Sequence, residues 1–405
     1  MNNLIKYTLF LLITTLLFSC KDDDKPTEQE NQYSDIYDLP STPFNYSNVD
    51  LPETFNSYVY SALDNIPNNN RITDEGATLG RVLFYDKELS FNRTISCSSC
   101  HKQEFGFADP VAKSEGFEGG HTRRNSMNIV NSGFYEPGKY FWDHRAATLE
   151  DQVIMPLQDG IEMGMTLELV TSRVTAKDYY KPLFKAAFNS EEVTTDKISK
   201  ALAQFVRSIY SFNTKYDQGI KQTKNIFVDF PNYTDAENLG KRVFNGILTP
   251  ESNGTCMFCH MGNENLRPDV AFDPNEVNQV LFVGLRADNI GLDADFRGTD
   301  GGVGEFTGQD SALGQFKTTS IRNIELTGPY MHDGRFETLE EVVEHYSTGV
   351  KAHPYLSNHM INGDGTPRNL NLSEDEKAGL VAFLKTLTDH TMTTDVKYSN
   401  PFVNQ

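Results

Sequence analysis

Cys97-Ser98-Ser99-Cys100-His101 and Cys256-Met257-Phe258-Cys259-His260 are two copies of the spacing C-x-x-C-H in this 405-residue sequence. Two thiols at this spacing can form thioether bonds to the two vinyl groups of a haem, and the adjacent His then binds the iron. The two motifs account for four of the five Cys residues. A redox dithiol would need a βαβ context, and a zinc site would need further Cys or His ligands, so neither explains both copies. The sequence therefore predicts two covalently bound c-type haems.

A similar stretch precedes each motif. Residues 73–84 read TDEGATLGRVLF, and residues 234–244 read TDAENLGKRVF. Each starts with a Thr and early acidic residues, as a helix N-terminus does, and continues with an apolar face that contains Leu-Gly. Glycine inside a helix costs about 1 kcal/mol relative to alanine, so its repetition indicates a close contact with another helix or with a haem.

Each half also ends with a predicted amphipathic helix, over residues 195–212 and 373–387. The order helix, C-x-x-C-H, loops and helix is the order expected of a cytochrome c domain. The predicted fold is therefore mainly α, with two cytochrome c-like domains related by internal duplication. We place them at residues 55–222 and 223–395, with few strands.

The N-terminus has the pattern of an exported lipoprotein. Lys6 precedes an apolar core over residues 7–18, which is too short for a permanent membrane span, and Leu17-Phe18-Ser19-Cys20 resembles a bacterial lipobox. Residues 1–20 are thus predicted to be a signal segment, with lipid attached at Cys20; an unmodified signal peptide is the alternative. Residues 21–54 are predicted to be a flexible tether, up to about residue 33, and an N-terminal extension. The expected location is periplasmic or on the cell surface, with membrane contact through the lipid anchor only.

The charge limits the partners. A formal net charge of −20 disfavours phosphate backbones and anionic membrane surfaces, so no nucleic-acid partner is expected. An acidic protein suits a basic electron donor only where its charge is locally patterned, which the sequence does not reveal.

Several further stretches match a known family. These stretches are residues 79–91, Phe141-Trp142-Asp143, Gly160-Ile161-Glu162-Met163 and residues 316–323. The strongest match is residues 326–335, LTGPYMHDGR, followed by Thr338-Leu339-Glu340. With the two C-x-x-C-H motifs, they make the chain resemble the bacterial di-haem cytochrome c peroxidase family over roughly residues 55–390.

The resemblance implies an N-terminal peroxidatic domain with His101 as proximal ligand and a C-terminal electron-transfer domain with His260 as proximal ligand. It also implies that Glu162 and Gln152 line the peroxide pocket. A base there must take the proton from the near oxygen of the peroxide and deliver it to the departing hydroxide. An exposed loop acid and a solvent-facing Gln are the alternatives for these two residues.

Trp142 is the only Trp in the chain, and in the family the Trp of this motif lies between the haems and resembles an electron relay. Hydrophobic packing is its alternative role, and the two roles can coexist. The Gly that usually follows Trp-Asp is replaced here by His144, a departure that affects the expected local geometry.

Three further assignments follow from the resemblance. His121 lies where some members carry a distal His that blocks the peroxidatic iron, although a loop His is more often exposed. Asn131, with the carbonyl oxygens of Thr327 and Pro329, corresponds to a calcium site between the domains, with plain loop hydrogen bonding as the alternative. Tyr346 is expected as the distal ligand of the His260 haem, as in the methylamine dehydrogenase maturation enzyme; His345 and Met360 are the alternatives.

The predicted function is that of a cytochrome c peroxidase: reduction of hydrogen peroxide to water with electrons from a small cytochrome c or a cupredoxin. One alternative is a di-haem enzyme that oxidises residues of a protein substrate, on the same scaffold. A non-catalytic electron-transfer cytochrome is another, and would need both irons permanently six-coordinate. The sequence leaves the electron donor and a homodimeric state open.

Overall fold

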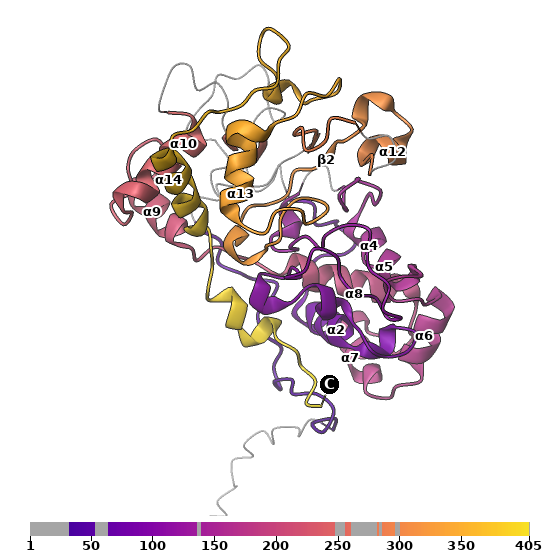
Figure 1. Cartoon of the computed structure of the whole chain (residues 1–405). Coiled ribbons are helices and arrows are strands. Elements are labelled where there is room, and N and C mark those ends of the chain that lie inside the picture. The colour runs from indigo at the N-terminus through magenta and orange to yellow at the C-terminus, as the bar shows by residue number, and fades with distance from the viewer. Residues whose placement is uncertain are drawn as a thin grey trace, which may run out of the picture.

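The computed structural model describes residues 32–52, 64–135, 139–247, 256–260, 282, 286–295 and 300–404. Within these ranges the chain is mainly helical, as predicted, and the sheet consists of an antiparallel pair, β1 (Ala287–Asp288) and β2 (Phe316–Lys317). The helices form two lobes, one from the indigo-to-magenta half of the chain and one from the orange half (Figure 1). The signal segment and Cys20 lie outside the described residues.

The N-terminal lobe is built on α2 and α8, which pack against each other. Its helices are α2 (Asp74–Tyr85), α3 (Cys97–Cys100), α4 (Leu149–Gln152), α5 (Met155–Gln158), α6 (Leu167–Thr175), α7 (Tyr180–Phe188) and α8 (Thr195–Arg207), with the short turns η1 (Lys87–Leu89), η2 (Gln103–Phe105) and η3 (Ser132–Phe134).

The C-terminal lobe repeats this arrangement with α10 and α14. Its helices are α9 (Lys215–Thr223), α10 (Asp235–Asn245), α11 (Cys256–His260), α12 (Val303–Thr307), α13 (Leu339–Glu344) and α14 (Glu374–Lys385), with η4 (Asp310–Ala312), η5 (Ile324–Leu326), the π-helical turn η6 (His345–Gly349) and η7 (Asn358–Met360).

The repeated Leu-Gly marks a helix crossing in both lobes. A Cβ atom built on Gly80 of α2 would collide with the carbonyl oxygen of Ala201 in α8. A Cβ atom on Gly240 of α10 would collide with the carbonyl oxygen of Gly379 in α14. Of the two contacts predicted for these glycines, the structure shows the helix contact. The internal duplication is thus visible in the packing as well as in the haem motifs.

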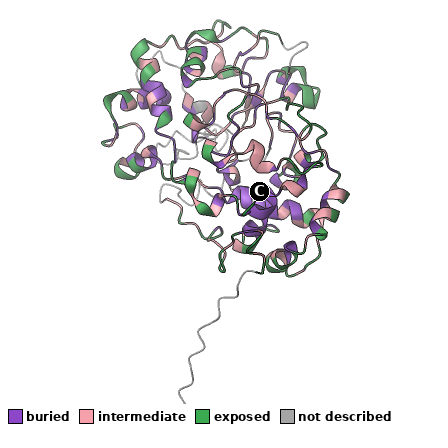
Figure 2. Cartoon of the chain, turned by 60° about the horizontal axis from the view of Figure 1, so that its bottom comes forward, coloured by how far each residue is buried: buried purple, intermediate pink, exposed green. Residues whose placement is uncertain are grey.

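Each lobe has its own apolar core, which the buried helix faces enclose (Figure 2). The core of the N-terminal lobe includes Leu83, Phe84 and Phe205. The core of the C-terminal lobe includes Phe244 and Phe383.

Helix α9 lies close to the predicted domain boundary at residue 222. Tyr216 and Ile220 of α9 belong to the C-terminal core, and the boundary itself stays a prediction. The apolar face of α9 packs against residues of the C-terminal lobe. An amphipathic pattern shows that a helix has a buried face, but it does not show which lobe that face joins.

The two ends of the described chain lie together on the N-terminal lobe. Tyr398 and Phe402 belong to the N-terminal core, and Tyr37 pairs with Phe402 in a β-bridge. Figure 1 shows the yellow segment, with η8 (Met392–Thr394) and η9 (Val396–Tyr398), running back to the indigo end of the chain. Residues 33–46 of the N-terminal extension are therefore packed against this lobe, and the C-terminal segment with Tyr398 and Phe402 joins the same core.

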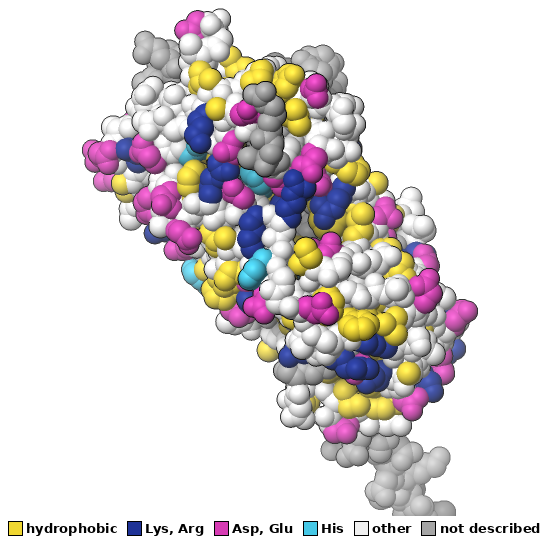
Figure 3. Space-filling model, turned by 45° about the vertical axis from the view of Figure 1, so that its right-hand side comes forward, with side chains coloured by type: hydrophobic (Ala, Val, Ile, Leu, Met, Phe, Trp, Pro, Cys, Tyr) yellow, Lys and Arg dark blue, Asp and Glu magenta, His cyan; other side chains and the backbone are white. Residues whose placement is uncertain are grey.

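The surface does not carry a uniform negative charge. Figure 3 shows Lys and Arg side chains gathered near the middle of one face, with Asp and Glu side chains beside them. None of the helices in the described ranges combines the length and apolarity that a membrane span requires.

Candidate active site

The first haem motif forms the short helix α3, and its His follows directly. Ser96 and Ser99 cap the start of this helix reciprocally. His101 Nδ1 lies 3.1 Å from the carbonyl oxygen of Phe107. A ring nitrogen that faces a carbonyl oxygen carries the proton, which leaves Nε2 with a lone pair for a metal. Burial lowers the pKa of His101 and so favours the neutral imidazole that iron binds.

The second motif forms α11 and repeats this geometry. His260 Nδ1 lies 3.1 Å from the carbonyl oxygen of Thr319. Burial lowers the pKa of His260 to about 4, so its ring is neutral at physiological pH. Both motifs therefore present two thiols and one imidazole Nε2, which is the donor set of a covalently bound haem.

A cavity, named the second cavity after this motif, adjoins the second motif. It is lined by Cys256, Cys259 and His260, and its other walls are mostly apolar, including Phe244, Ile321, Leu339, Val342, Leu380 and Leu384. An apolar slot with two thiols and an imidazole at one side fits a haem group. The cavity also reaches Trp142 of the N-terminal lobe.

Two of the three candidate distal ligands line this cavity. Tyr346 and Met360 are both part of its wall. Burial, followed by the nearby Cys259 and Cys256 thiols, raises the pKa of Tyr346, and its hydroxyl makes no hydrogen bond to any described residue. His345 instead directs its Nε2 to the carbonyl oxygen of Ile290, at 3.0 Å. The structure thus brings Tyr346 and Met360, but not His345, to the cavity.

Glu162 lies near the first haem motif. Its backbone nitrogen donates a hydrogen bond of 3.1 Å to Asp159, and its side chain is half-buried. Burial is the main cause of the raised pKa values of the Cys97 and Cys100 thiols, and the negative charge of Glu162 adds a smaller contribution to both. Burial, with a smaller effect of Asp159, raises the pKa of Glu162 to about 7. A carboxyl group with this pKa can both accept and release a proton at neutral pH.

Gln152 and His121 are less clearly connected to this site. Gln152 ends α4 and is half-buried, and its side chain has no hydrogen bond to Glu162 within the described residues. His121 is exposed and lies in a β-bridge with Glu115. The same loop contacts the Glu162 segment, because Phe117 donates a backbone hydrogen bond of 3.0 Å to the carbonyl oxygen of Glu162. Both assignments stay predictions.

Trp142 lies between the two lobes. Its indole Nε1 donates a hydrogen bond of 2.8 Å to the carbonyl oxygen of Asn125, and its ring lies 6.4 Å from that of His332, edge to face. His332 is buried, and its ring stacks on Phe316 at 3.6 Å. The structure thus brings Trp142 to an aromatic group at the edge of the second cavity.

Two of the three predicted calcium ligands belong to the cavity wall. Thr327 and Pro329 line the cavity, and Asn131 is not part of its lining. The amide group of Asn131 exchanges two hydrogen bonds with the backbone of Ser211, and its oxygen keeps a second lone pair, so the calcium assignment stays a prediction. Asn125, Met127 and Asn128 of the segment before Asn131 line the cavity, and the sequence analysis selected none of them.

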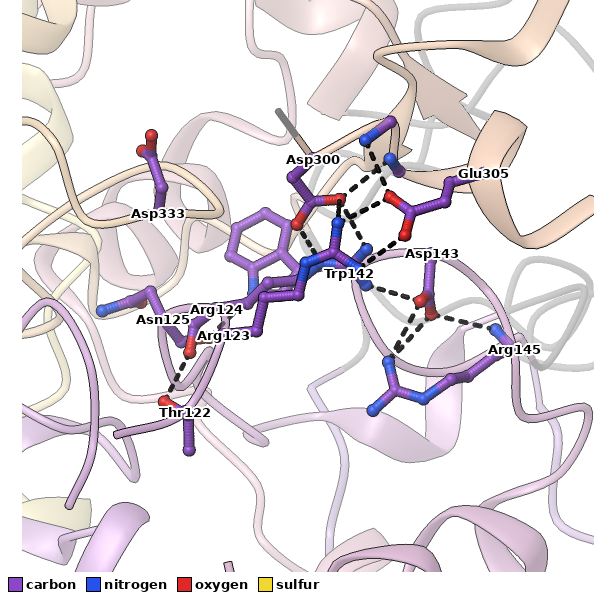
Figure 4. A network of polar contacts seen from close by, with 12 residues as sticks. Thr122, Arg123, Arg124, Asn125, Trp142, Asp143, Arg145, Asp300, Glu305 and Asp333 are labelled. Atoms are coloured by element: carbon purple, nitrogen blue, oxygen red, sulfur yellow. Dashed lines mark hydrogen bonds and ion pairs between the residues drawn. The ribbon is translucent and has the colours of Figure 1, made fainter. Parts of the chain in front are cut away.

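The sequence analysis also missed a network of ion pairs around Trp142. Arg124 binds both Asp143 and Asp300, and Arg123 binds Glu305 (Figure 4). The only available signal was the position of Arg123 and Arg124 just after His121, because Asp300 lies in a stretch rich in Gly and Asp that reads as an ordinary loop.

Comparisons with known proteins agree with this geometry. A model of the di-haem cytochrome c peroxidase family matches residues 74–225. Methylamine utilization protein MauG of Methylorubrum extorquens is 32% identical over 325 residues, which cover 79% of this chain and 80% of that protein. Cytochrome c551 peroxidase of Nitrosomonas europaea is 30% identical over 77% of this chain and 79% of that protein.

Solved structures show the same fold. A MauG-like protein associated with microbial copper homeostasis has a TM-score of 0.69 and 33% identity, and the match covers 87% of this chain and 99% of that one. The di-haem peroxidase BthA from Burkholderia thailandensis has a TM-score of 0.61 over 80% of this chain and 88% of that one, at 22% identity. The likeness to BthA, at 22% identity, shows a shared fold only.

Proposed function

Because this chain belongs to the di-haem cytochrome c peroxidase family, we propose that it reduces hydrogen peroxide to water with electrons from a small cytochrome c or cupredoxin. The reaction consumes one H2O2, two electrons and two protons and yields two molecules of water. The observation that carries the proposal is the pair of C-x-x-C-H motifs, in each of which the Nδ1 of the His lies 3.1 Å from a backbone carbonyl oxygen and Nε2 is left for iron. The pKa of Glu162, raised by burial to about 7, supports its part in the reaction.

Two sets of residues would hold the haems. Cys97, Cys100 and His101 form one set, and Cys256, Cys259 and His260 form the other. When bound, the haems supply the iron that exchanges electrons with the donor and with peroxide.

Glu162 is proposed as the proton carrier of the reaction. Its carboxylate accepts the proton from the near oxygen of the peroxide, and the resulting carboxylic acid donates it to the departing hydroxide. Gln152 is proposed to orient the peroxide, and Trp142 to conduct single electrons between the lobes. His121, on the neighbouring loop, is proposed as the distal ligand of the first haem.

Steady-state turnover of peroxide by the haem-loaded protein with a reduced donor tests the proposal. Wild type should turn over, and Glu162→Gln should keep both haems but lose about 10²–10⁴-fold in rate, because an amide cannot carry the proton. Glu118→Gln is a matched control, because Glu118 is an exposed acid of the neighbouring loop. No turnover by wild type, or equal rates in Glu162→Gln, would overturn the proposal.

Oxidation of residues in a protein substrate is the second candidate function. It is favoured by Tyr346, which lines the second cavity as the sequence resemblance to the maturation enzyme implies. Rapid peroxide turnover with a small redox donor would argue against it.

Calcium, export and lipid attachment at Cys20 are also proposals. The carbonyl oxygens of Thr327 and Pro329 are hard donors of the kind that calcium prefers, with Asn131 proposed as the side-chain ligand. Among the described residues, no group of three or more His, Cys, Asp or Glu side chains forms a metal site, and the proposed calcium ligands are accordingly two backbone oxygens and an amide oxygen.

A further inference from the structure

Trp142 is held by contacts to separate segments of the chain. Its indole Nε1 donates a hydrogen bond to the carbonyl oxygen of Asn125. Its own carbonyl oxygen accepts a hydrogen bond of 2.8 Å from the backbone nitrogen of Lys317, in β2 of the other lobe. The next residue, Asp143, binds Arg124 at 2.5 Å through its carboxylate. The position of the indole therefore depends on residues 124 and 125 as well as on its own backbone.

Arg124 joins the two lobes. Its Nε and one terminal nitrogen bind the carboxylate of Asp300 at 2.6 and 2.7 Å, while its other terminal nitrogen binds Asp143. The three side chains are 13% exposed or less, so solvent screens these pairs little. Burial would raise the pKa of Asp300, but the hydrogen bonds from Arg124 lower it to about 2, so the carboxylate is charged at neutral pH.

A planar guanidinium can bind two carboxylates at fixed angles, whereas the ammonium group of a lysine cannot. Figure 4 shows Arg124 in this position, with Trp142 beside it. Asn125 follows in the chain, and its backbone nitrogen donates a hydrogen bond of 2.8 Å to the carbonyl oxygen of His332. A shift of Arg124 would therefore also shift the acceptor of the indole hydrogen bond.

We propose that Arg124 is a positioning residue for electron transfer: by binding Asp143 in one lobe and Asp300 in the other, it fixes Trp142 against the second cavity. This role rests on the proposed function of Trp142 as the electron path. Arg124 itself gains and loses neither a proton nor an electron. It acts by setting the distance and orientation of the indole relative to both haem sites.

Arg123 provides a matched control. It has the same side chain and the neighbouring position, but its pair with Glu305 is exposed on both sides, at 55% and 45%. It reaches Asp300 at 3.4 Å, and within the described residues it makes no contact with Asp143. Its removal should therefore leave Trp142 in place.

The test compares haem-loaded wild type with Arg124→Gln, Arg124→Lys and Arg123→Gln. The first measurement is the rate of electron transfer between the haems after flash photolysis of carbon monoxide from the half-reduced protein. The second is the ultraviolet resonance Raman band that reports the indole N–H hydrogen bond. Because Trp142 is the only Trp in the chain, this band has a single source.

Arg124→Gln should slow the transfer several-fold and shift the indole band toward a weaker hydrogen bond. Arg124→Lys should give a transfer rate and an indole band between those of Arg124→Gln and wild type. Arg123→Gln should match wild type in the transfer rate and in the band. Arg124→Gln should still fold, because Asp143 keeps Arg145 as a partner and Asp300 keeps Arg123. If it does not fold, Asp300→Asn weakens the contact of Arg124 to the second lobe while leaving Asp143 in place, and it is expected to change both measurements in the same direction. Because Asp300 also pairs with Arg123, the Arg123→Gln variant is the control for this substitution too.

Wild-type values in Arg124→Gln, or equal changes in Arg123→Gln, would overturn the inference. An unchanged transfer rate in Trp142→Phe would do the same, because the indole would then not be the path. Neither measurement uses peroxide. Absence of peroxide turnover in wild type would therefore contradict the proposed function while a slowed transfer in Arg124→Gln still supported the inference.

Discussion

Arg322 and Asp217 form a buried two-point ion pair, with the guanidinium nitrogens 2.7 and 2.9 Å from the two carboxylate oxygens. Arg322 is fully buried, and Asp217 also accepts hydrogen bonds from the backbone and hydroxyl of Thr214. The pair joins the start of α9 to the segment after β2, so it connects the first helix of the C-terminal lobe to the wall of the second cavity.

Asp217→Asn should destabilise the protein by about 3–5 kcal/mol, because it leaves the Arg322 cation buried without its counter-charge. Urea unfolding of the haem-loaded protein measures this loss. Asp178→Asn is the control, since the Asp178–Lys181 pair is exposed and should change the free energy of unfolding by less than about 1 kcal/mol. Equal changes in the free energy of unfolding for the two substitutions would show that the buried pair contributes no more to stability than the exposed pair.

Peroxide turnover should depend on pH through Glu162. Burial and Asp159 raise its pKa to about 7, while Arg145 lowers it, so the carboxylate that acts as base is the minor form below pH 7 and the major form above it. The value of kcat/KM should therefore rise with pH to about 7 and then level off. Arg145→Gln removes a cation that favours the carboxylate and should move the midpoint upward. A flat profile through neutral pH in wild type would exclude Glu162 as the base.

Mass analysis should find two covalent haems on protein that has been matured in a bacterial periplasm. Each motif supplies both thioether sulfurs, so replacing Cys97 and Cys100 together by Ala should remove one haem addition. The Cys256 and Cys259 pair should behave in the same way. Two additions in either double variant would show that the attachment sites lie elsewhere.

Tyr346→Phe should change the spectrum of the ferric haem at His260. Loss of the oxygen ligand with little change of shape should make this haem high-spin or allow Met360 to bind. Absorption and paramagnetic resonance spectra distinguish these states. If the spectra respond to Met360→Leu and not to Tyr346→Phe, Met360 is the ligand.

Gly240→Ala should destabilise the C-terminal lobe by about 1–3 kcal/mol, because the added methyl group forces α10 away from the backbone of α14. Thermal unfolding followed at both haem bands measures the effect. Gly363→Ala is the control, since a Cβ atom at Gly363 meets no atom within 4 Å. Equal stability of the two variants would contradict the role assigned to the repeated Leu-Gly.

Much of the fold could be predicted because its signals are local in the chain. Thr73 and Thr234 start their helices through hydrogen bonds three residues away, and Gly80 and Gly240 recur at the same helix position. The lobe that each segment joins could not be predicted in this way. The faces of α9 and of the segment with Tyr398 are apolar, but only the assembled molecule shows which core each one joins.

The sequence by itself determined the two haem motifs, because two thiols and an imidazole must be close in the chain to hold one haem. It also determined the helical class and the duplication, since both follow from short-range patterns. Only the tertiary structure decided the neighbours of Glu162, the pairing of Arg124 with Asp300, and the place of Asn125 beside Trp142. These contacts join residues far apart in the chain, and their energies depend on burial and distance, which the sequence does not encode locally.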